Sequence, residues 1–338
     1  MNGVWFVGIL CRLTLLVIML SGLFQPVSAE DRAFPSVPPG RLAFRSYGSE
    51  QGLTNLSMWS LEQDGEGFLW VGTESGLFRY DGNRFQRFSI KEGLPADLVR
   101  VVFAAKTGAL WLGTLQGVAI REGNRIKALG AEAGLNTSEI FAFAEDREGR
   151  IWVGADHGLF RQKPGQHRFD PMPGWPSEAT ARALWLDAST AYVVSGNKLF
   201  AYDLPTASAP REVPGPWTER LDSLARDGMG RLWVRTRSQL WMQPATGGAF
   251  VDMNQHLTGT AFFDGALRID QGGNLLIPMA EGLARLKGDT WEYLGENQGL
   301  PTPWVNRTLV DREGSLWVCG TGLHRSLGRE VWRQYTQR

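Results

Sequence analysis

Cysteine and histidine are scarce in this chain, and their scarcity excludes several kinds of site. The 338 residues include two cysteines and four histidines. Cys11 lies in an N-terminal segment that we expect to be cleaved, so Cys319 has no partner and no intramolecular disulfide is predicted. The sequence contains no HExxH motif, no cysteine pair, no His/Cys cluster and no Gly-x-Ser-x-Gly nucleophile motif. We therefore predict no metal, no cofactor and no enzymatic activity.

An excess of charge of one sign is missing as well. The chain carries 35 Lys and Arg residues against 35 Asp and Glu residues. A surface that binds nucleic acid is usually strongly basic, so nucleic acid is not among the expected partners. Beyond the N-terminal segment the apolar stretches are short, and none shows a 3.6-residue period long enough for a helix. The composition thus favours a β-protein.

Residues 1–29 form the one long apolar run. It ends at Val27-Ser28-Ala29, a small-x-small site, and a secretory signal peptide cleaved after Ala29 is predicted. The basic region before the run is thin, so an uncleaved membrane anchor is the alternative. In both cases the rest of the chain lies outside the cytoplasm, and we expect a periplasmic protein. Residues 30–40 are a Pro-rich lead-in.

A repeat of about 41 residues governs the remainder of the chain. Its clearest copy is GFLWVGTESGLFRY at 67–80, which returns as GALWLGTLQGVAIR at 108–121 and as GRIWVGADHGLFR at 149–161. Aligning all copies, weak ones included, gives the anchor residues Trp70, Trp111, Trp152, Tyr192, Trp233, Leu276 and Trp317. A fixed period of this length indicates a repeat architecture with seven units.

Each repeat contains four short segments rich in Val, Leu, Phe and Trp, separated by Gly and Asp, as is typical of strands and turns. One four-stranded sheet cannot bury both faces, but seven sheets stacked round an axis can. The sequence therefore predicts an all-β fold, a seven-bladed β-propeller of four-stranded blades over residues 41–330. Residues 41–47 and 331–336 both look like a fourth segment. If residues 41–47 complete the last blade, residues 331–338 are an extra strand or the start of a missing domain.

Several conspicuous residues are interpreted as structural. Five Asp-x-x-Gly turns look like a metal or catalytic series, but turn chemistry alone predicts Asp and Gly there. The anchor tryptophans recur at one position of the repeat, which favours packing between blades. Cys319 replaces a glycine of the LWVGT motif, which favours a buried thiol. A solvated surface position is predicted for all four histidines, namely His157, His167, His256 and His324.

The pattern GLPxxxVxxVxxDxxGxLWVGTxxGLxRYDG resembles the two-component-regulator propeller repeat, most clearly from Gly52 to Gly82. The resemblance implies the periplasmic sensor part of a membrane receptor, which in that family precedes a transmembrane helix and a histidine kinase or diguanylate cyclase. It also implies an oligosaccharide as the ligand, as in many members. This chain departs from the family because it stops after one propeller and has no recognisable kinase or cyclase motif. We expect a membrane-bound kinase or cyclase as partner, in cis if the chain is a truncated receptor and otherwise in trans.

A binding site is predicted where the first strands of the blades line the central channel. Eleven residues before the anchor, this strand carries an unlike residue in every repeat, whereas core positions in a repeat should be alike. The set mixes aromatic rings with side chains that hydrogen-bond to polar ligands. The predicted ligand ring is Trp59, Arg100, Phe141, Asp222 and Asn306, with Trp304 in a nearby loop as a lesser candidate. The alternative is that these positions are merely exposed and unconstrained.

The sequence thus predicts a ligand-binding sensor propeller of a two-component or cyclic-dinucleotide signalling system. Two alternatives stay open. A stand-alone scaffold that binds proteins predicts a broad exposed apolar patch. A lyase or hydrolase on the same fold predicts turnover that is lost when one carboxylate or histidine is changed.

Overall fold

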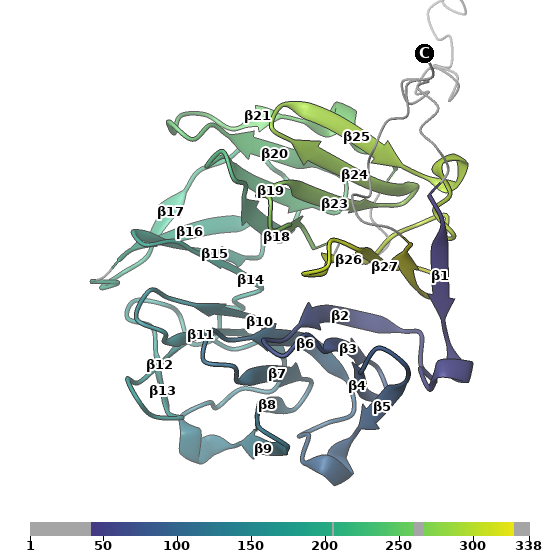
Figure 1. Ribbon diagram of the computed structural model, residues 1–338. Coiled ribbons are helices and arrows are strands. Elements are labelled where there is room, and N and C mark those ends of the chain that lie inside the picture. The colour runs from purple at the N-terminus through teal and green to yellow at the C-terminus, as the bar shows by residue number, and fades with distance from the viewer. Residues whose placement is uncertain (1–41, 205, 260–265, 328–338) are drawn as a thin grey trace, which may run out of the picture. The chain divides into compact units, whose positions relative to one another are not determined.

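The computed structural model describes residues 42–204, 206–259 and 266–327, which belong to one compact unit. These residues form seven four-stranded antiparallel sheets, and helix within them is limited to single-turn 3-10 segments. The predicted seven-bladed β-propeller is confirmed (Figure 1). The predicted signal peptide, the Pro-rich lead-in and the extra strand at 331–336 lie outside the described residues.

Each of the first six blades takes its four strands in chain order. Blade 1 contains β2 (Met58–Gln63), β3 (Leu69–Thr73), β4 (Gly76–Tyr80) and β5 (Phe85–Phe88), and blade 2 contains β6 (Val99–Ala104), β7 (Leu110–Thr114), β8 (Gly117–Glu122) and β9 (Arg125–Leu129). Blade 3 contains β10 (Ile140–Glu145), β11 (Ile151–Ala155), β12 (Leu159–Gln162) and β13 (Phe169–Pro171), and blade 4 contains β14 (Ala183–Leu186), β15 (Thr190–Ser195), β16 (Lys198–Asp203) and β17 (Arg211–Val213). Blade 5 contains β18 (Leu221–Arg226), β19 (Leu232–Thr236), β20 (Leu240–Gln243) and β21 (Val251–Asp252), and blade 6 contains β22 (Arg268–Ile269), β23 (Leu275–Met279), β24 (Gly282–Lys287) and β25 (Thr290–Leu294).

The last blade is built from both ends of the described chain. Its strands β26 (Arg307–Val310), β27 (Leu316–Cys319) and β28 (Leu323–Ser326) are joined by β1 (Phe44–Tyr47), which pairs antiparallel with β28. Phe44–Tyr47, from the segment that resembles a fourth segment of the repeat, thus completes the last blade. The innermost strands of blades 1 to 6 contact their neighbours in turn, β26 contacts β23 of blade 6, and β26 meets β2 of blade 1 (Figure 1). This closure removes an open sheet edge.

The anchor tryptophans lie between blades, as predicted. Trp70 is fully buried and packs with Val102 and Leu110 of the second blade. Its indole N–H donates to Asp64 Oδ2 at 2.7 Å, while Oδ1 of the same carboxylate accepts backbone amides of the turn. The same indole–carboxylate bond recurs for Trp152, Trp233 and Trp317. The Asp-x-x-Gly series is thus structural, because one carboxylate closes the turn and satisfies a buried donor.

Two glycines of the repeat mark places where the chain approaches itself closely. Gly52 follows the 3-10 segment Ser49–Gln51 with a left-handed φ of 92°, and a Cβ added there would lie 2.7 Å from the carbonyl oxygen of Phe85. A Cβ added at Gly154, in the LWVGT-type strand of blade 3, would lie 2.5 Å from the carbonyl oxygen of Ala181 in the next blade. Glycine is therefore required by backbone conformation at the first position and by blade packing at the second.

Candidate ligand-binding site

Four of the innermost strands are irregular at the same place. In β2, β6, β10 and β18 the pairing register with the second strand shifts by one residue. The residues left out of these pairings are Trp59, Arg100, Phe141 and Asp222. A bulge of this kind releases one residue from the ladder and re-aims its side chain. Four of the five predicted ring residues are thus set apart from their strands by the same backbone feature.

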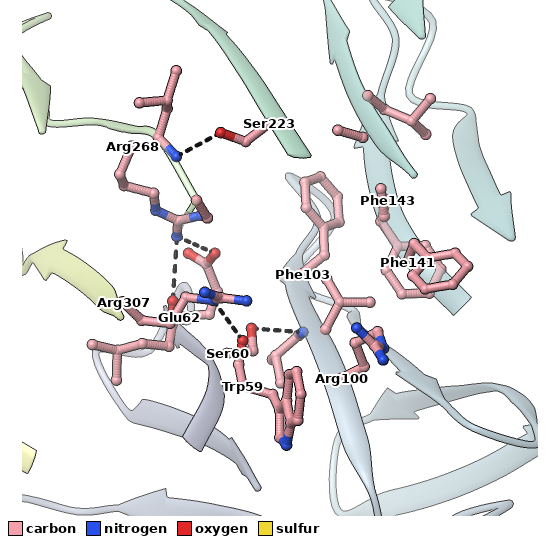
Figure 2. A pocket seen from close by; sticks show the side chains of 18 of the residues that line it. Trp59, Ser60, Glu62, Arg100, Phe103, Phe141, Phe143, Ser223, Arg268 and Arg307 are labelled. Carbon is pink, nitrogen blue, oxygen red and sulfur yellow. Dashed lines mark hydrogen bonds and ion pairs between the residues drawn. The ribbon is translucent and has the colours of Figure 1, made fainter. Parts of the chain in front are cut away.

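The four bulged side chains line one cavity in the central channel. Its volume is about 210 Å³, and all of the innermost strands contribute to its wall. Figure 2 shows Trp59 and Arg100 together at one end, with Glu62 and Arg268 farther along the channel. The residue before each bulged position, for example Val99, is buried in the core. The structure therefore brings Trp59, Arg100, Phe141 and Asp222 together in the channel.

Guanidinium groups alternate with aromatic rings round this end of the channel. Cζ of Arg100 lies 4.8 Å from the ring centroid of Trp59 and 5.0 Å from that of Phe141. Arg182 covers Phe141 in the same way, at 5.0 Å. Cations at these distances are attracted to the ring faces. Arg100 also forms an ion pair with Glu139, so this part of the rim is held by charge as well as by stacking.

Asp222 is surrounded by arginines. Its carboxylate is buried and lies 2.7 Å from Nη2 of Arg220 and 3.6 Å from Nε of Arg182. Arg235, which replaces the LWVGT glycine in blade 5, is fully buried and donates to the carbonyl oxygen of Pro278. Burial lowers the pKa of Arg235 to about 10, and the carboxylate of Asp222 acts in the opposite direction. Asp222 therefore compensates buried charge as well as lining the channel.

Asn306 lies apart from the other four predicted residues. It stands one residue before β26 and lines a second cavity, beside the channel, that it shares with Trp59. Its Nδ2 donates to the carbonyl oxygen of Met58 at 3.1 Å, and its Oδ1 accepts from Arg307 Nη1 at 2.7 Å. The side chain is therefore engaged where blade 7 meets blade 1.

Three arginines of the channel wall, Arg182, Arg268 and Arg307, were not predicted. Arg182 and Arg307 line the cavity, each one residue after the aligned position of its repeat. Strand β14 pairs with β15 without a register shift and one residue later than the bulged strands pair with theirs, whereas β26 begins at Arg307 itself. An arginine directly after Ala181 and after Asn306 is the signal in the sequence that marks both.

The prediction of four surface histidines is wrong for His324. This side chain in β28 is 6% exposed, its Nδ1 lies 2.8 Å from Ser46 Oγ of β1, and burial lowers its pKa. It is buried because β1 pairs alongside β28. His256 is half-buried and stacks on Trp291 with ring centroids 3.9 Å apart. Cys319 is buried, as predicted, and burial raises the pKa of its thiol to about 12.

The described part of the chain gives little support for a metal site, a membrane-spanning helix or a broad apolar patch. No group of three or more His, Cys, Asp or Glu residues there could hold a metal ion. Nor does any helix among these residues have the length and apolar character needed to cross a membrane. The exposed large apolar side chains include Ile90, Met229 and Val251, which come from different parts of the ring.

Two of the repeats match a known family model. Residues 52–75 and 134–157 match the family model of the two component regulator propeller. These two stretches run from the Gly-Leu pair through the LWVGT-type strand of the first and third repeats. The chain therefore carries two-component-regulator propeller repeats, and the resemblance inferred from the motif is confirmed. No curated protein matches the chain.

Solved structures share the fold at low sequence identity. The extracellular domain of BT3049 from B. thetaiotaomicron, described as a hybrid two component system, is 19% identical with a TM-score of 0.72, over 84% of this chain and 42% of that one. The corresponding domain of BT4673 from B. thetaiotaomicron is 20% identical with a TM-score of 0.68, over 86% of this chain and 40% of that one. This chain thus spans about two fifths of their length.

An enzyme shares the same fold. A catalytically inactive virginiamycin B lyase from Staphylococcus aureus, solved with quinupristin, is 12% identical with a TM-score of 0.62, over 85% of this chain and all of that one. Likeness at this level of identity concerns the fold alone, and function has to be argued from the site.

Proposed function

We propose that this propeller is the extracytoplasmic ligand-binding part of a bacterial sensor that acts through a two-component or cyclic-dinucleotide signalling system. Its partner in that proposal is a membrane-bound histidine kinase or diguanylate cyclase. The proposal is supported by the family of the repeats and by the extracellular domains of hybrid two component systems that share the fold. In this account the chain works by binding rather than by catalysis, from the periplasmic side of the membrane.

The observation that carries the proposal is the row of bulges at one end of the channel. A bulge disrupts the ladder locally, yet four blades keep one at the same place and each turns a different side chain to the same cavity. Core packing needs like residues at like positions in a repeat. Unlike residues on a shared backbone irregularity support a site that recognises an asymmetric ligand.

The chemistry of the rim suggests the class of ligand. Trp59 and Phe141 offer ring faces, and Arg100 and Arg182 offer N–H groups held by stacking on those rings. Rings pack against the apolar faces of sugars, and guanidinium groups bind hydroxyl, carboxylate or sulfate oxygens. A small polar ligand such as an oligosaccharide fits this surface. Asn306, in the neighbouring cavity, would contact only a ligand long enough to extend past Trp59.

The proposal is tested by thermal-shift measurements on the purified chain with a panel of neutral and acidic oligosaccharides, followed by calorimetric titration of any that stabilise it. Trp59→Ala and Arg100→Ala are each expected to weaken binding by about tenfold or more, because each removes a stacking or charge-assisted contact. Met229→Ala, at the exposed β18–β19 turn and outside the cavity lining, is the control and is expected to keep full affinity.

Circular dichroism and melting of each variant separate loss of binding from loss of fold. A ligand that binds both ring variants with unchanged affinity would show that the site lies elsewhere on the propeller. Conversion of the ligand into a product, abolished by changing one carboxylate or histidine, would favour the enzyme alternative instead.

A further inference from the structure

A larger cavity than that of the ring lies beside the channel, where blade 7 meets blade 1. Its volume is about 530 Å³, which is within the range of small-molecule sites. The wall includes Asn55, Leu56, Trp59, Glu74, Trp304 and Thr321. Trp59 comes from β2, and the others come from the loop before β2, the β3–β4 turn, the loop before β26 and the β27–β28 turn. We call this the seam cavity.

The walls of the seam cavity are tied to one another by hydrogen bonds. The backbone amide of Glu74 donates to the carbonyl oxygen of Ser57 at 3.2 Å, which joins the β3–β4 turn to the loop before β2. On the other side, Thr302 Oγ1 donates to the carbonyl oxygen of Trp304 and accepts from the amide of Thr321. The cavity is therefore formed before any ligand arrives, which lowers the cost of binding.

The charge of the seam cavity is opposite to that of the channel. Four arginines line the channel cavity beside two carboxylates, Glu62 and Asp222. Among the lining residues of the seam cavity, Glu74 is the one with a charged side chain. Leu56 is 44% exposed although it is apolar, so the cavity offers both apolar surface and one anionic group.

The two cavities share Trp59, and the indole of Trp59 already contacts a cationic side chain of the protein itself. Arg100 lies 4.8 Å from the ring centroid of Trp59 on the channel side. The same residue also lines the seam cavity, whose wall includes a second indole, that of Trp304. Aromatic rings combined with a carboxylate are the arrangement that recognises quaternary ammonium and other organic cations.

We propose that the seam cavity is a second binding site, which adjoins the channel cavity and shares Trp59 with it, and that it takes a small organic cation such as an alkylammonium compound. The ammonium group lies against Trp59 and Trp304 near Glu74, and the apolar part of the ligand covers Leu56. An anion is disfavoured there, because Glu74 repels it and no arginine or lysine lines the wall.

Choline and its uncharged isostere 3,3-dimethyl-1-butanol test this inference, because they differ in charge and hardly in shape. Calorimetric titration of the full chain is expected to detect choline and to give an affinity for the alcohol that is about tenfold weaker, since only choline gains from the rings and the carboxylate. Raising the salt concentration is expected to weaken the binding of choline and to leave the alcohol unaffected.

Variants locate the site. Trp304→Leu and Glu74→Gln are each expected to weaken choline by several-fold, and Glu74→Gln is expected to spare the alcohol. The matched control is Glu178→Gln, which removes a carboxylate whose side chain is 85% exposed in the loop before β14. Phe141→Leu alters the channel but not the seam cavity and is expected to leave choline binding intact.

Each contrary result overturns the inference. Equal affinity for choline and the alcohol would show that the cavity does not select charge, and absence of choline binding would show that it takes no small cation. Loss of choline binding in Phe141→Leu but not in Trp304→Leu would assign the cation to the channel.

Discussion

Blades 3 and 4 are neighbours that present different positions of the repeat to the same channel. In blade 3 the register of β10 against β11 shifts at Phe141, and the ring of Phe141 lines the cavity. In blade 4 the pairing of β14 with β15 is regular, the aligned residue Ala181 is fully buried, and Arg182 lines the cavity instead. A single extra residue in the ladder therefore decides which side chain of a repeat can touch a ligand.

The reason for the difference lies in what packs behind the strand. The carbonyl oxygen of Ala181 lies so close to Gly154 of blade 3 that a Cβ on that glycine would be only 2.5 Å away. Ala181 itself is fully buried, so a larger side chain there would have to displace its neighbours. Adjacent residues of a strand point to opposite faces. A register change of one residue therefore turns the channel-facing side chain into the core and brings its neighbour to the channel.

The largest loss of stability is expected for Asp222→Ala, because Asp222, unlike the other bulged residues, also balances buried positive charge. Its removal takes away the buried carboxylate that pairs with Arg182 at 3.6 Å and that opposes the charge of the fully buried Arg235. Breaking a buried ion pair from one side costs about 3–5 kcal/mol. We expect a loss of this size in the free energy of unfolding measured with urea. Arg220→Ala, whose side chain is 55% exposed, is the control and is expected to cost less than about 1 kcal/mol.

A double change identifies the cause of that loss. Replacing Arg235 by Met together with Asp222→Ala removes the uncompensated charge, and it is expected to recover part of the stability. If the double variant is no more stable than Asp222→Ala alone, the carboxylate acts through local strand geometry and not through Arg235.

The comparison between blades 3 and 4 is tested directly at its two aligned positions. Ala181→Phe forces a ring into a packed core and is expected to destabilise the fold by about 1–3 kcal/mol. Phe141→Ala removes a half-buried ring from the wall of an open channel, so it leaves no sealed void and is expected to cost about 1 kcal/mol. Both values are obtained from urea unfolding followed by circular dichroism.

The relative size of the two losses of stability tests the comparison between blades 3 and 4. A larger loss for Phe141→Ala than for Ala181→Phe would mean that the bulged position belongs to the core and that the regular position tolerates bulk. The contrast that defines the ring would then be wrong.

The fold could be predicted from the sequence because its determinants recur. A tryptophan or equivalent every 41 residues or so, an Asp-x-x-Gly turn and a Gly-Leu pair are local signals, and each reports a contact that the structure repeats from blade to blade. Even the closure of the last blade by residues 41–47 could be inferred, because that segment looks like the fourth strand that every other blade possesses.

The candidate site could be predicted only in part. Counting a fixed number of residues back from the anchor finds Trp59, Arg100, Phe141 and Asp222, because their strands share the bulge. It misses Arg182, because a regular strand and a bulged strand look alike in a sequence. Burial of His324 was missed for a related reason, since it depends on the register between β1 and β28, whose residues are 278 positions apart.

The smallest effect on stability is expected at Glu219. This residue lies in the loop before β18 of blade 5, which differs here from the loop before β14 of blade 4. Hydrogen bonds from the hydroxyls of Ser238 and Thr236 lower the pKa of Glu219 below its usual value and join the loop before β18 to the β19–β20 turn. Glu178 holds the aligned position before β14, but its side chain is 85% exposed. The two glutamates therefore allow a matched pair of substitutions.

The sign of the pH effect follows from the lowered pKa. The unfolded chain takes up a proton at Glu219 at a higher pH than the folded chain, so this group stabilises the fold above its unfolded pKa of about 4.3. That stabilisation is lost as the pH falls through the lower folded value. Urea unfolding between neutral pH and about pH 3 is expected to show a slightly smaller pH dependence for Glu219→Gln than for Glu178→Gln. Identical profiles for the two variants would mean that the loop before β18 is held by its backbone and by the bulge at Asp222, and not by the carboxylate.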